Sequence, residues 1–323
     1  MSMKYLVTGG CGFIGANFCH LLSQKGDEIF IIDKMTYAAN EENIKGLEYK
    51  LYKGDIGDYN LVKKILIENK IDIIVNFAAE THVDNSIEGP GVFIETNILG
   101  TYNLLRAALE YQQNVKNDLK FLHVSTDEVF GDLQADDPKF NEHTRYEPSS
   151  PYSASKAASD HLVRAWIRTY GLNGIVTNCS NNYGLYQNEE KLIPKTIKSC
   201  IERKPITIYG TGLNIRDWIW TSDHCMGIYL ALQNFKKGET YCFGGDCERT
   251  NLEIIEMICE IFQEKSKDNF DYKSLMVFVE DRKGHDFRYA IDSSKAKKEL
   301  GFKNKEGEGL RENLQLLVDS YSI

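Results

Sequence analysis

The chain has 323 residues, enough to bury one large α/β core with an appended lobe, or about two domains. Its 42% hydrophobic and 26% charged residues are ordinary for a globular protein, and no run of about eighteen apolar residues predicts a membrane span. A formal net charge of -9 excludes strong long-range attraction to nucleic acid or to an anionic membrane.

Eight cysteines lie mostly within apolar runs, and none forms a C-x-x-C pair with another. This usage predicts reduced thiols in a cytoplasmic protein rather than a disulfide framework or a metal site. The first predicted strand begins at Lys4, so we expect no secretory segment before it.

A glycine-rich turn follows that first strand, KYLVT at residues 4–8, and leads into an amphipathic helix at residues 16–25. Glycines in such a turn allow a tight bend, let the backbone approach a pyrophosphate, and let helix and strand pack closely. The pattern therefore predicts a dinucleotide site rather than a purely structural turn. The glycines are Gly9, Gly12 and Gly15, in G-x-x-G-x-x-G spacing.

The second predicted strand, residues 28–32, ends in Asp33, eighteen positions after Gly15. An acidic side chain there is placed to bind ribose hydroxyls and to repel a 2′-phosphate. The sequence thus predicts NAD rather than NADP, a preference that Lys34 weakens slightly.

Strands and helices continue to alternate along the amino-terminal half. Asp55 and Ile56 follow a strand, where they flank an adenine or form a surface turn, and a helix is predicted at residues 59–69. The next strand, residues 71–77, ends at Ala78 and Ala79, which are small enough for a cofactor to pass close by.

A polar loop containing His82 comes next, followed by a long helix at residues 91–111. A single loop histidine is more often a hydrogen-bonding residue than a ligand group. Thr96 and Asn97 interrupt the apolar positions of the helix.

Three proton-handling side chains follow a short apolar strand at residues 121–125. Thr126, Asp127 and Glu128 reach one ligand only if the strand stops there, because successive strand residues point to opposite faces. The carboxyl ends of parallel strands are where ligands bind in open α/β sheets. The alternative is a polar turn in which Asp127 caps the next segment.

Tyr152 and Lys156 stand four residues apart on a predicted helix that begins near Pro151, so they share one face. A lysine ammonium and a cationic nicotinamide ring both favour the phenolate of a nearby tyrosine. Such a tyrosine can remove a proton from an alcohol while hydride leaves for the ring.

The strand and helix order predicts an α/β fold, a Rossmann-like doubly wound parallel sheet with a smaller mixed α/β carboxyl-terminal lobe. We expect an NAD-binding domain at residues 1–180 and a nucleotide-sugar-binding lobe at residues 181–323, with some segments returning to the first domain. In the lobe, T-N-L-E at residues 250–253 reads as a capping box that opens a helix, and Gly301 as a helix stop.

Together these motifs resemble the extended short-chain dehydrogenase/reductase superfamily, and within it the dTDP-glucose 4,6-dehydratase family. The most specific is the T-D-E triplet, because related sugar epimerases carry small residues in place of the acid pair. The similar segments run in order from Tyr5 to about Leu317: TGGCGFIG, DKMTYAAN, AAETHVDNSI, STDEVFGD, SPYSASKAASDHLVRA, NCSNNYG, EKLIP, RDWIWTSDHC and RKGHDFRYAIDSSKAKKELGF.

The resemblance implies a role for each catalytic residue. Tyr152 would deprotonate the sugar 4-hydroxyl while NAD takes the C4 hydride, Lys156 would lower the tyrosine pKa, and Thr126 would hydrogen-bond the 4-oxygen. Glu128 would then remove the C5 proton, and Asp127, which must be protonated, would protonate the departing 6-hydroxyl. The hydride returns to C6, so the cofactor ends as it began.

The resemblance also implies the binding residues and a homodimer built on the helices after Gly91 and Pro151. NAD would contact Gly9, Gly12, Phe13, Ile14, Gly15, Asp33, Lys34, Thr36, Asp55, Ile56, Ala78, Ala79, Thr96, Tyr152, Lys156 and Asn182. The nucleotide sugar, dTDP-glucose, would contact Thr81, His82, Thr126, Asn181, Lys191, Leu192, Thr207, Tyr209, Arg216, Arg282 and His285, with the two arginines on the diphosphate.

Several alternatives stay open at this stage. Thr207 and Cys242 replace residues that are usual around the nucleotide in the family, so a 4,6-dehydratase of another nucleotide sugar is possible. A nucleotide-sugar 4-epimerase or a dehydrogenase would share the fold, and so would a non-catalytic NAD-sensing regulator. Neither the epimerase nor the dehydrogenase has an evident use for both Asp127 and Glu128, and the regulator would not require Tyr152 and Lys156. Without the resemblance, Arg216, Arg282 and His285 would read as surface residues.

Overall fold

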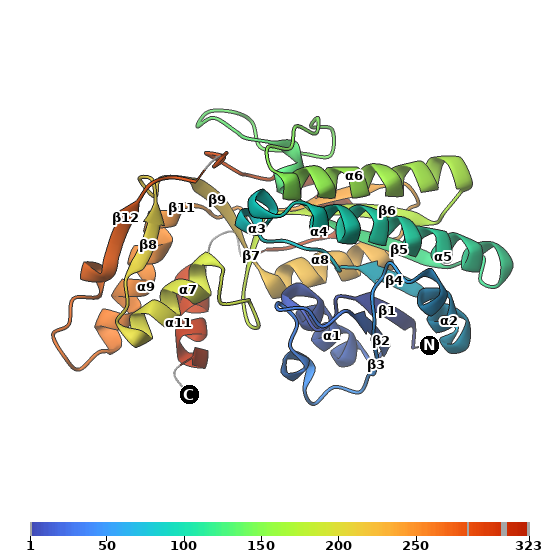
Figure 1. The fold of residues 1–323 in the computed structure, drawn as a ribbon, viewed down its shortest axis with the longest axis horizontal. Coiled ribbons are helices and arrows are strands. Elements are labelled where there is room, and N and C mark those ends of the chain that lie inside the picture. Colours follow the sequence, from blue (N-terminus) through green and yellow to red (C-terminus); the bar gives the residue numbers. More distant parts are fainter. Residues whose placement is uncertain (1, 283, 305–308, 322–323) are drawn as a thin grey trace.

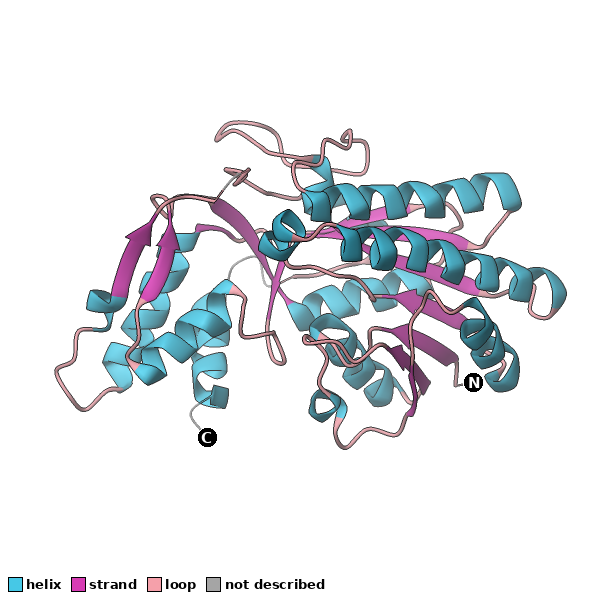
Figure 2. Cartoon of the chain, viewed as in Figure 1, coloured by secondary structure: helices cyan, strands magenta, loops and turns pink. Residues whose placement is uncertain are grey.

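The computed structural model describes residues 2–282, 284–304 and 309–321. Its main sheet has seven strands in the order β3-β2-β1-β4-β5-β6-β10, and every neighbouring pair is parallel (Figures 1 and 2). The predicted Rossmann-like fold class is confirmed. The strands are β1 (Lys4–Thr8), β2 (Glu28–Asp33), β3 (Lys50–Lys53), β4 (Ile73–Asn76), β5 (Lys120–Thr126), β6 (Gly174–Cys179) and β10 (Thr240–Phe243).

Both faces of this sheet are covered because its strands are apolar on both sides. Tyr5 and Val7 of β1 pack into the core beneath α1, α8 and α10, whereas Leu6 packs into the core beneath α2, α5 and α6. The helices are α1 (Phe13–Lys25), α2 (Tyr59–Asn69), α5 (Thr101–Asn114), α6 (Pro151–Ala165), α8 (Thr221–Gln233) and α10 (Ser294–Leu300).

The helix predicted at residues 91–111 is continuous but not uniform. It starts as α4 (Gly91–Phe93), widens to π-helical turns over Ile94–Gly100, and continues as α5. Asn97 lies in the wide turns, where its side chain bonds the backbone N–H and C=O of Glu80 at 2.8 and 3.0 Å. The interruption noted in the sequence therefore marks a local change of helix type, as is common near functional sites.

A smaller lobe surrounds a second apolar core (Figure 1, left side). One of its sheets has the order β11-β9-β7 and the other pairs β12 with β8. Its strands are β7 (Asn181–Tyr183), β8 (Ile206–Tyr209), β9 (Ile215–Trp220), β11 (Glu248–Thr250) and β12 (Met276–Val279). Its helices are α7 (Leu192–Glu202), α9 (Asn251–Lys265) and α11 (Leu310–Tyr321).

The predicted helix boundaries in this lobe follow from capping. Thr250 and Glu253 form the reciprocal capping box that starts α9, with Thr250 Oγ1 accepting from the Glu253 N–H at 3.1 Å. Gly301, at φ 68°, ends α10 in the left-handed region. Beyond residue 180 the chain crosses back, since α8, β10 and α10 pack with the main sheet. The single domain division at residue 180 stays a prediction.

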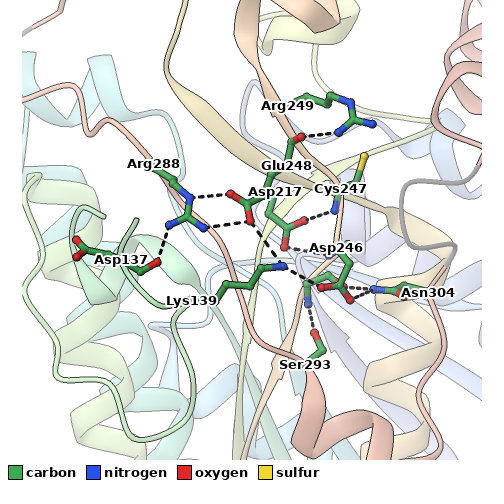
Figure 3. A network of polar contacts seen from close by, with 12 residues as sticks. Asp137, Lys139, Asp217, Asp246, Cys247, Glu248, Arg249, Arg288, Ser293 and Asn304 are labelled. Atoms are coloured by element: carbon green, nitrogen blue, oxygen red, sulfur yellow. Dashed lines mark hydrogen bonds and ion pairs between the residues drawn. The ribbon is translucent and has the colours of Figure 1, made fainter. Parts of the chain in front are cut away.

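A polar network connects strands β9 and β11 of the small lobe with loops that flank the main sheet (Figure 3). Asp217 on β9 accepts the N–H groups of Gly245 and Cys247 at 3.2 and 2.8 Å. Arg288 binds both carboxylate oxygens of Glu248, at 2.7 and 3.1 Å. Because these contacts link β9 and β11 to the loop after β10, they fix the small lobe against the main sheet.

Two other findings bear on the class of protein. Across the described ranges, no helix is long and apolar enough to cross a membrane. All eight cysteines are free and buried.

Candidate active site

The glycine turn after β1 makes a cradle that side chains would fill. Gly9 has φ 66°, and a Cβ there would lie 3.0 Å from the Ala78 backbone. A Cβ on Gly15 would lie 2.2 Å from the Gly9 carbonyl oxygen, so α1 can approach β1 this closely only with glycine. The amino end of α1 is left open beside this turn, as a pyrophosphate requires.

Asp33 is held in place by the backbone around it. Its two carboxylate oxygens accept the N–H groups of Cys11 at 2.9 Å and Met35 at 2.8 Å. Burial raises its pKa, and these two bonds oppose the rise. Lys34 forms an ion pair with Asp55 at 2.8 Å, so its ammonium is already matched by a carboxylate.

These groups line one cavity of about 300 Å³ along the carboxyl ends of the strands. Its shape and chemistry fit NAD, with a glycine cradle for the pyrophosphate and Asp33 for the ribose. Every predicted cofactor residue lines it: Gly9, Gly12, Phe13, Ile14, Gly15, Asp33, Lys34, Thr36, Asp55, Ile56, Ala78, Ala79, Thr96, Tyr152, Lys156 and Asn182.

The T-D-E triplet occupies the end of β5, as predicted. The strand stops at Thr126 and Asp127–Phe130 form a 3-10 turn, so consecutive side chains no longer alternate between faces. Thr126, rather than Asp127, caps this turn, because its hydroxyl accepts the Glu128 N–H at 3.3 Å. Asp127 is therefore not used as a cap.

Asp127 and Glu128 have environments that favour their protonated forms. Asp127 is 2% exposed, and its Oδ2 has no hydrogen-bond partner among the described residues. Burial, with Glu128 and Asp217 nearby, raises the pKa of Asp127, and Arg216 opposes the rise. Burial also raises the pKa of Glu128, against the attraction of Lys191 and Arg216.

Tyr152 and Lys156 face the same cavity from α6. The helix begins at Pro151 because Ser150 caps it, in a reciprocal pair with Ser153. Lys156 is 4% exposed and donates to the Val124 carbonyl at 2.8 Å. Burial raises the pKa of Tyr152 and lowers the pKa of Lys156, so each ionised form depends on charges supplied nearby.

A second cavity of about 600 Å³ opens from the first toward the small lobe. Glu128, Asn181, Asn182 and Lys191 line both cavities, so the two form one continuous crevice. The other predicted substrate residues line the second cavity, except for Thr81 and Thr126, which line the first. The predicted residues that line only the second cavity are His82, Leu192, Thr207, Tyr209, Arg216, Arg282 and His285.

The predicted diphosphate arginines are not ordinary surface residues. Arg216 is 8% exposed, stacks on the Tyr289 ring at 4.3 Å, and donates to the Asp286 carbonyl at 3.0 Å. Arg282 stacks on the Tyr209 ring at 5.0 Å and lies 3.6 Å from Asp84. Both guanidiniums are held by stacking and face the crevice.

Three of the predicted substrate residues, His82, Lys191 and His285, have defined positions at the crevice. His82 lies at the end of the loop, as predicted, and caps a short helix that was not predicted, α3 (Val83–Glu88); its Nδ1 accepts the Asn85 N–H at 3.3 Å. Lys191 precedes α7 and donates to the Thr81 carbonyl at 3.2 Å. His285 Nδ1 lies 2.7 Å from Asp281.

The sequence analysis missed several residues of the crevice. Tyr289 supports Arg216, and its hydroxyl donates to Asp286, which also accepts from Ser149 at 2.5 Å. Glu190 lies 3.8 Å from His82. Glu190 lies inside E-K-L-I-P, and Asp286 and Tyr289 lie inside R-K-G-H-D-F-R-Y, but no local pattern distinguishes them from other polar loop residues.

Comparison with known proteins gives the family. Residues 6–312 match the family model described as GDP-mannose 4,6 dehydratase. The dTDP-glucose 4,6-dehydratase of Haemophilus influenzae is 48% identical over 93% of each chain.

Solved structures agree with this relationship. The Streptomyces venezuelae dTDP-glucose 4,6-dehydratase, with NAD and TYD bound, is 40% identical, with a TM-score of 0.90 over 99% of this chain and 97% of that one. The Bacillus anthracis dTDP-glucose 4,6-dehydratase, in complex with NAD, is 39% identical, with a TM-score of 0.86 over the same shares. The resemblance predicted from the motifs is confirmed, and the chain belongs to the dTDP-glucose 4,6-dehydratase family.

Proposed function

We propose that this chain converts dTDP-glucose to dTDP-4-keto-6-deoxy-glucose by internal oxidation and reduction with loss of water. One observation carries the proposal. A hydroxyl and two carboxyl groups, from Thr126, Asp127 and Glu128, line the same cavity as Tyr152 and Lys156. Family membership gives the reaction class, and this constellation supplies the groups for both proton removal and dehydration.

Tyr152 is the proposed base for the sugar 4-hydroxyl. NAD, when bound here, supplies a reversible hydride acceptor and a positive ring beside the phenol. Burial raises the pKa of Tyr152, and the Thr126 hydrogen bond opposes the rise. Lys156, one turn along the same helix, would add a second positive charge that favours the phenolate. Thr126 donates a hydrogen bond to the sugar 4-oxygen.

Asp127 and Glu128 are the proposed dehydration pair. A 4-ketone acidifies the C5 proton, which Glu128 removes, and Asp127 gives its proton to the departing 6-hydroxyl. The two groups need different protonation states, and their surroundings differ accordingly. Burial raises the pKa of both groups. For Asp127, the neighbouring Glu128 and Asp217 add to this rise, whereas for Glu128 the next largest influences, Lys191 and Arg216, oppose it.

The second cavity is the proposed site of the nucleotide part of the substrate. Arg216 and Arg282 would bind its diphosphate, because guanidinium groups suit planar, bidentate contacts with phosphate. Lys191 and His285 flank the same crevice. Asn181, at the boundary of the two cavities, would contact the sugar.

We also propose a cytoplasmic homodimer. Exposed apolar side chains, Val92, Ile94, Leu99 and Tyr102, lie along the helix at residues 91–114, next to α6. Eight buried free thiols suit a reducing compartment. We expect Leu99→Lys to shift the dimer to monomer in sedimentation equilibrium, and Ile67→Lys, also exposed but on α2, to leave it unchanged.

The experiment is incubation of the NAD-loaded protein with a panel of nucleotide sugars. We expect a 4-keto-6-deoxy product from dTDP-glucose, with no accumulation of NADH and with C4 deuterium recovered at C6. Formation of a 4-epimer, or of NADH in amounts equal to product, would overturn the proposal. Preference for a GDP or UDP sugar would keep the dehydratase chemistry and reject only the proposed base.

A further inference from the structure

Behind Tyr152 and Lys156 lies a row of buried polar side chains that the proposed reaction does not use. Thr8 on β1, Asn76 on β4, His123 on β5 and Asp160 on α6 are each at most 1% exposed. Polar groups at this depth are costly unless they are paired, so their arrangement is informative.

The hydrogen bonds along this row fix the state of His123. The Thr8 hydroxyl donates to Asn76 Oδ1 at 2.6 Å, and Asn76 Nδ2 donates to His123 Nδ1 at 3.0 Å. Since Nδ1 accepts, Nε2 carries the ring proton. Nε2 lies 3.3 Å from Asp160 Oδ1, a close polar contact that is not aligned as a hydrogen bond, and neither atom has another partner among the described residues. Burial lowers the pKa of His123 to about 4, so the ring is a neutral donor at pH 7.

Asp160 is the anionic end of the row. Its Oδ2 accepts from the Tyr146 hydroxyl at 2.7 Å and from Asn178 Nδ2 at 3.4 Å. Burial acts to raise the pKa of Asp160, but His123, Lys156 and Tyr146 outweigh it and hold the pKa below its usual range. A fully buried carboxylate that stays ionised needs a positive partner.

Lys156 is placed to be that partner. It stands one helical turn before Asp160 on the same face of α6 and is itself buried. Burial lowers the pKa of Lys156, and Asp160 gives the largest opposing effect, followed by Cys179.

We infer that Asp160 is a positioning residue, whose carboxylate, held by His123, Tyr146 and Asn178, keeps Lys156 an ammonium beside Tyr152. The inference rests on the proposed function, because it assumes the roles of Tyr152 and Lys156 given above. The charged and titratable groups that face this pair are Tyr152 and Arg164 from α6, His123 from β5, Cys179 from β6 and Tyr146 from the loop before α6.

The test is the pH dependence of kcat in the holoenzyme with Asp160→Asn, which keeps the shape of the side chain and removes its charge. Without the carboxylate, Lys156 loses its proton at lower pH. We expect kcat at pH 7 to fall by about 10-fold or more, and the alkaline limb of the profile to move down by about one pH unit or more. A fall in kcat that is equal at every pH would overturn the inference.

Tyr146→Phe is the matched control, and it also tests the inference if Asp160→Asn does not fold. It removes one hydrogen bond but leaves the carboxylate, whose charge is then less compensated. We expect the alkaline limb to stay in place or to move to higher pH, and a move to lower pH would contradict the inference. NAD affinity is measured in parallel to show that each variant is folded.

The two proposals fail in different ways. If the unmodified protein yields no 4-keto-6-deoxy product from any nucleotide sugar, the proposed function is wrong. If it yields that product and the limb of Asp160→Asn does not move, only the role of Asp160 is wrong.

Discussion

At the scale of single residues, burial decides the chemistry of this site. Asp127, Tyr152 and Lys156 are buried and Glu128 is half-buried, and burial is the largest influence on the pKa of each group. It raises the pKa of the two carboxyl groups and the phenol, and it lowers that of the lysine. The charges near each carboxyl group then differ, and this difference suits one of them to act as the acid and the other as the base.

Asp127→Asn and Tyr152→Phe should stop the reaction at different stages. Asp127→Asn retains the base for oxidation but cannot protonate the leaving hydroxyl, so NADH should accumulate with dTDP-glucose. Tyr152→Phe should give no NADH. Each variant should lower kcat by about 10²- to 10⁴-fold, measured by product formation and NADH absorbance. Asp136→Asn, an exposed carboxylate in the loop at residues 131–150, is the control and should be unaffected.

Glu128→Gln should separate the steps in the same way as Asp127→Asn, since it removes the C5 base without touching the cofactor cradle. The expected result is loss of dehydration with unchanged NAD affinity. Loss of C5 proton exchange with deuterated water locates the defect. Full activity in both carboxyl variants would contradict the assigned pair.

Asp217 should make stability depend on pH. Burial raises its pKa to about 6, above the value of about 4 for an unfolded aspartate. A raised carboxyl pKa favours folding below about pH 4, and this advantage is lost as pH rises through 6. Urea unfolding should show wild type losing about 3 kcal/mol relative to Asp217→Asn between these limits. A constant difference between the two proteins would reject this view of Asp217.

At the scale of elements, the site depends on where strands and helices stop or change type. The end of β5 at Thr126 turns Asp127 and Glu128 into the cavity. The π-helical turns at Ile94–Gly100 bring Asn97 to the Glu80 backbone and to the Ser155 hydroxyl, at 2.8 Å from the latter. They hold Thr96 at the cofactor cavity.

Asn97→Ala should therefore destabilise the protein, although alanine has a higher helix propensity than asparagine. It leaves the Glu80 N–H and C=O without their side-chain partner in a half-buried position. We expect a loss of about 1–3 kcal/mol in urea unfolding and weaker NAD binding. Asn114→Ala, at the exposed end of α5, should change neither quantity appreciably.

At the scale of the whole molecule, activity requires the small lobe to face the main sheet in one arrangement. In the proposed binding mode, Arg216 on β9 contacts a substrate whose sugar lies at the end of β5. The network of Figure 3 fixes this geometry, because Glu248 and Asp217 lie opposite Arg288 and the loop after β10. In the antiparallel pairing of β11 with β9, Glu248 lies opposite Asp217.

We expect Arg288→Met to weaken the contacts that hold the small lobe against the main sheet. The guanidinium also donates to the carbonyls of Gln134 and Asp137, so its removal breaks contacts with the loop before α6 as well as the ion pair. We expect a loss of about 2–4 kcal/mol in stability and faster proteolysis in residues 131–150. The control is Arg249→Met, because Arg249 lies next to Glu248 on β11. Equal effects of the two changes would reject a special role for Arg288.

Local patterns predicted the amino-terminal half well. The helix at residues 59–69 and the strand ending in Asp33 follow from periodicity, which acts over a few residues. The same holds for the helix stop at Gly301 near the carboxyl end. The pairings of β9 with β11 and of β8 with β12 were not predicted. They join segments far apart in the chain, and short strands carry little local signal.

The fold class and the proposed catalytic residue types could be predicted from the sequence alone, because the glycine turn, T-D-E and Y-x-x-x-K each place particular residue types at a fixed spacing. Only the tertiary structure decided which polar residues are buried. Arg216 lies on Tyr289, more than seventy positions away, and Asp160 lies against His123 on another element. Burial sets pKa values and charge pairing, and it depends on packing between distant segments, which no local pattern records.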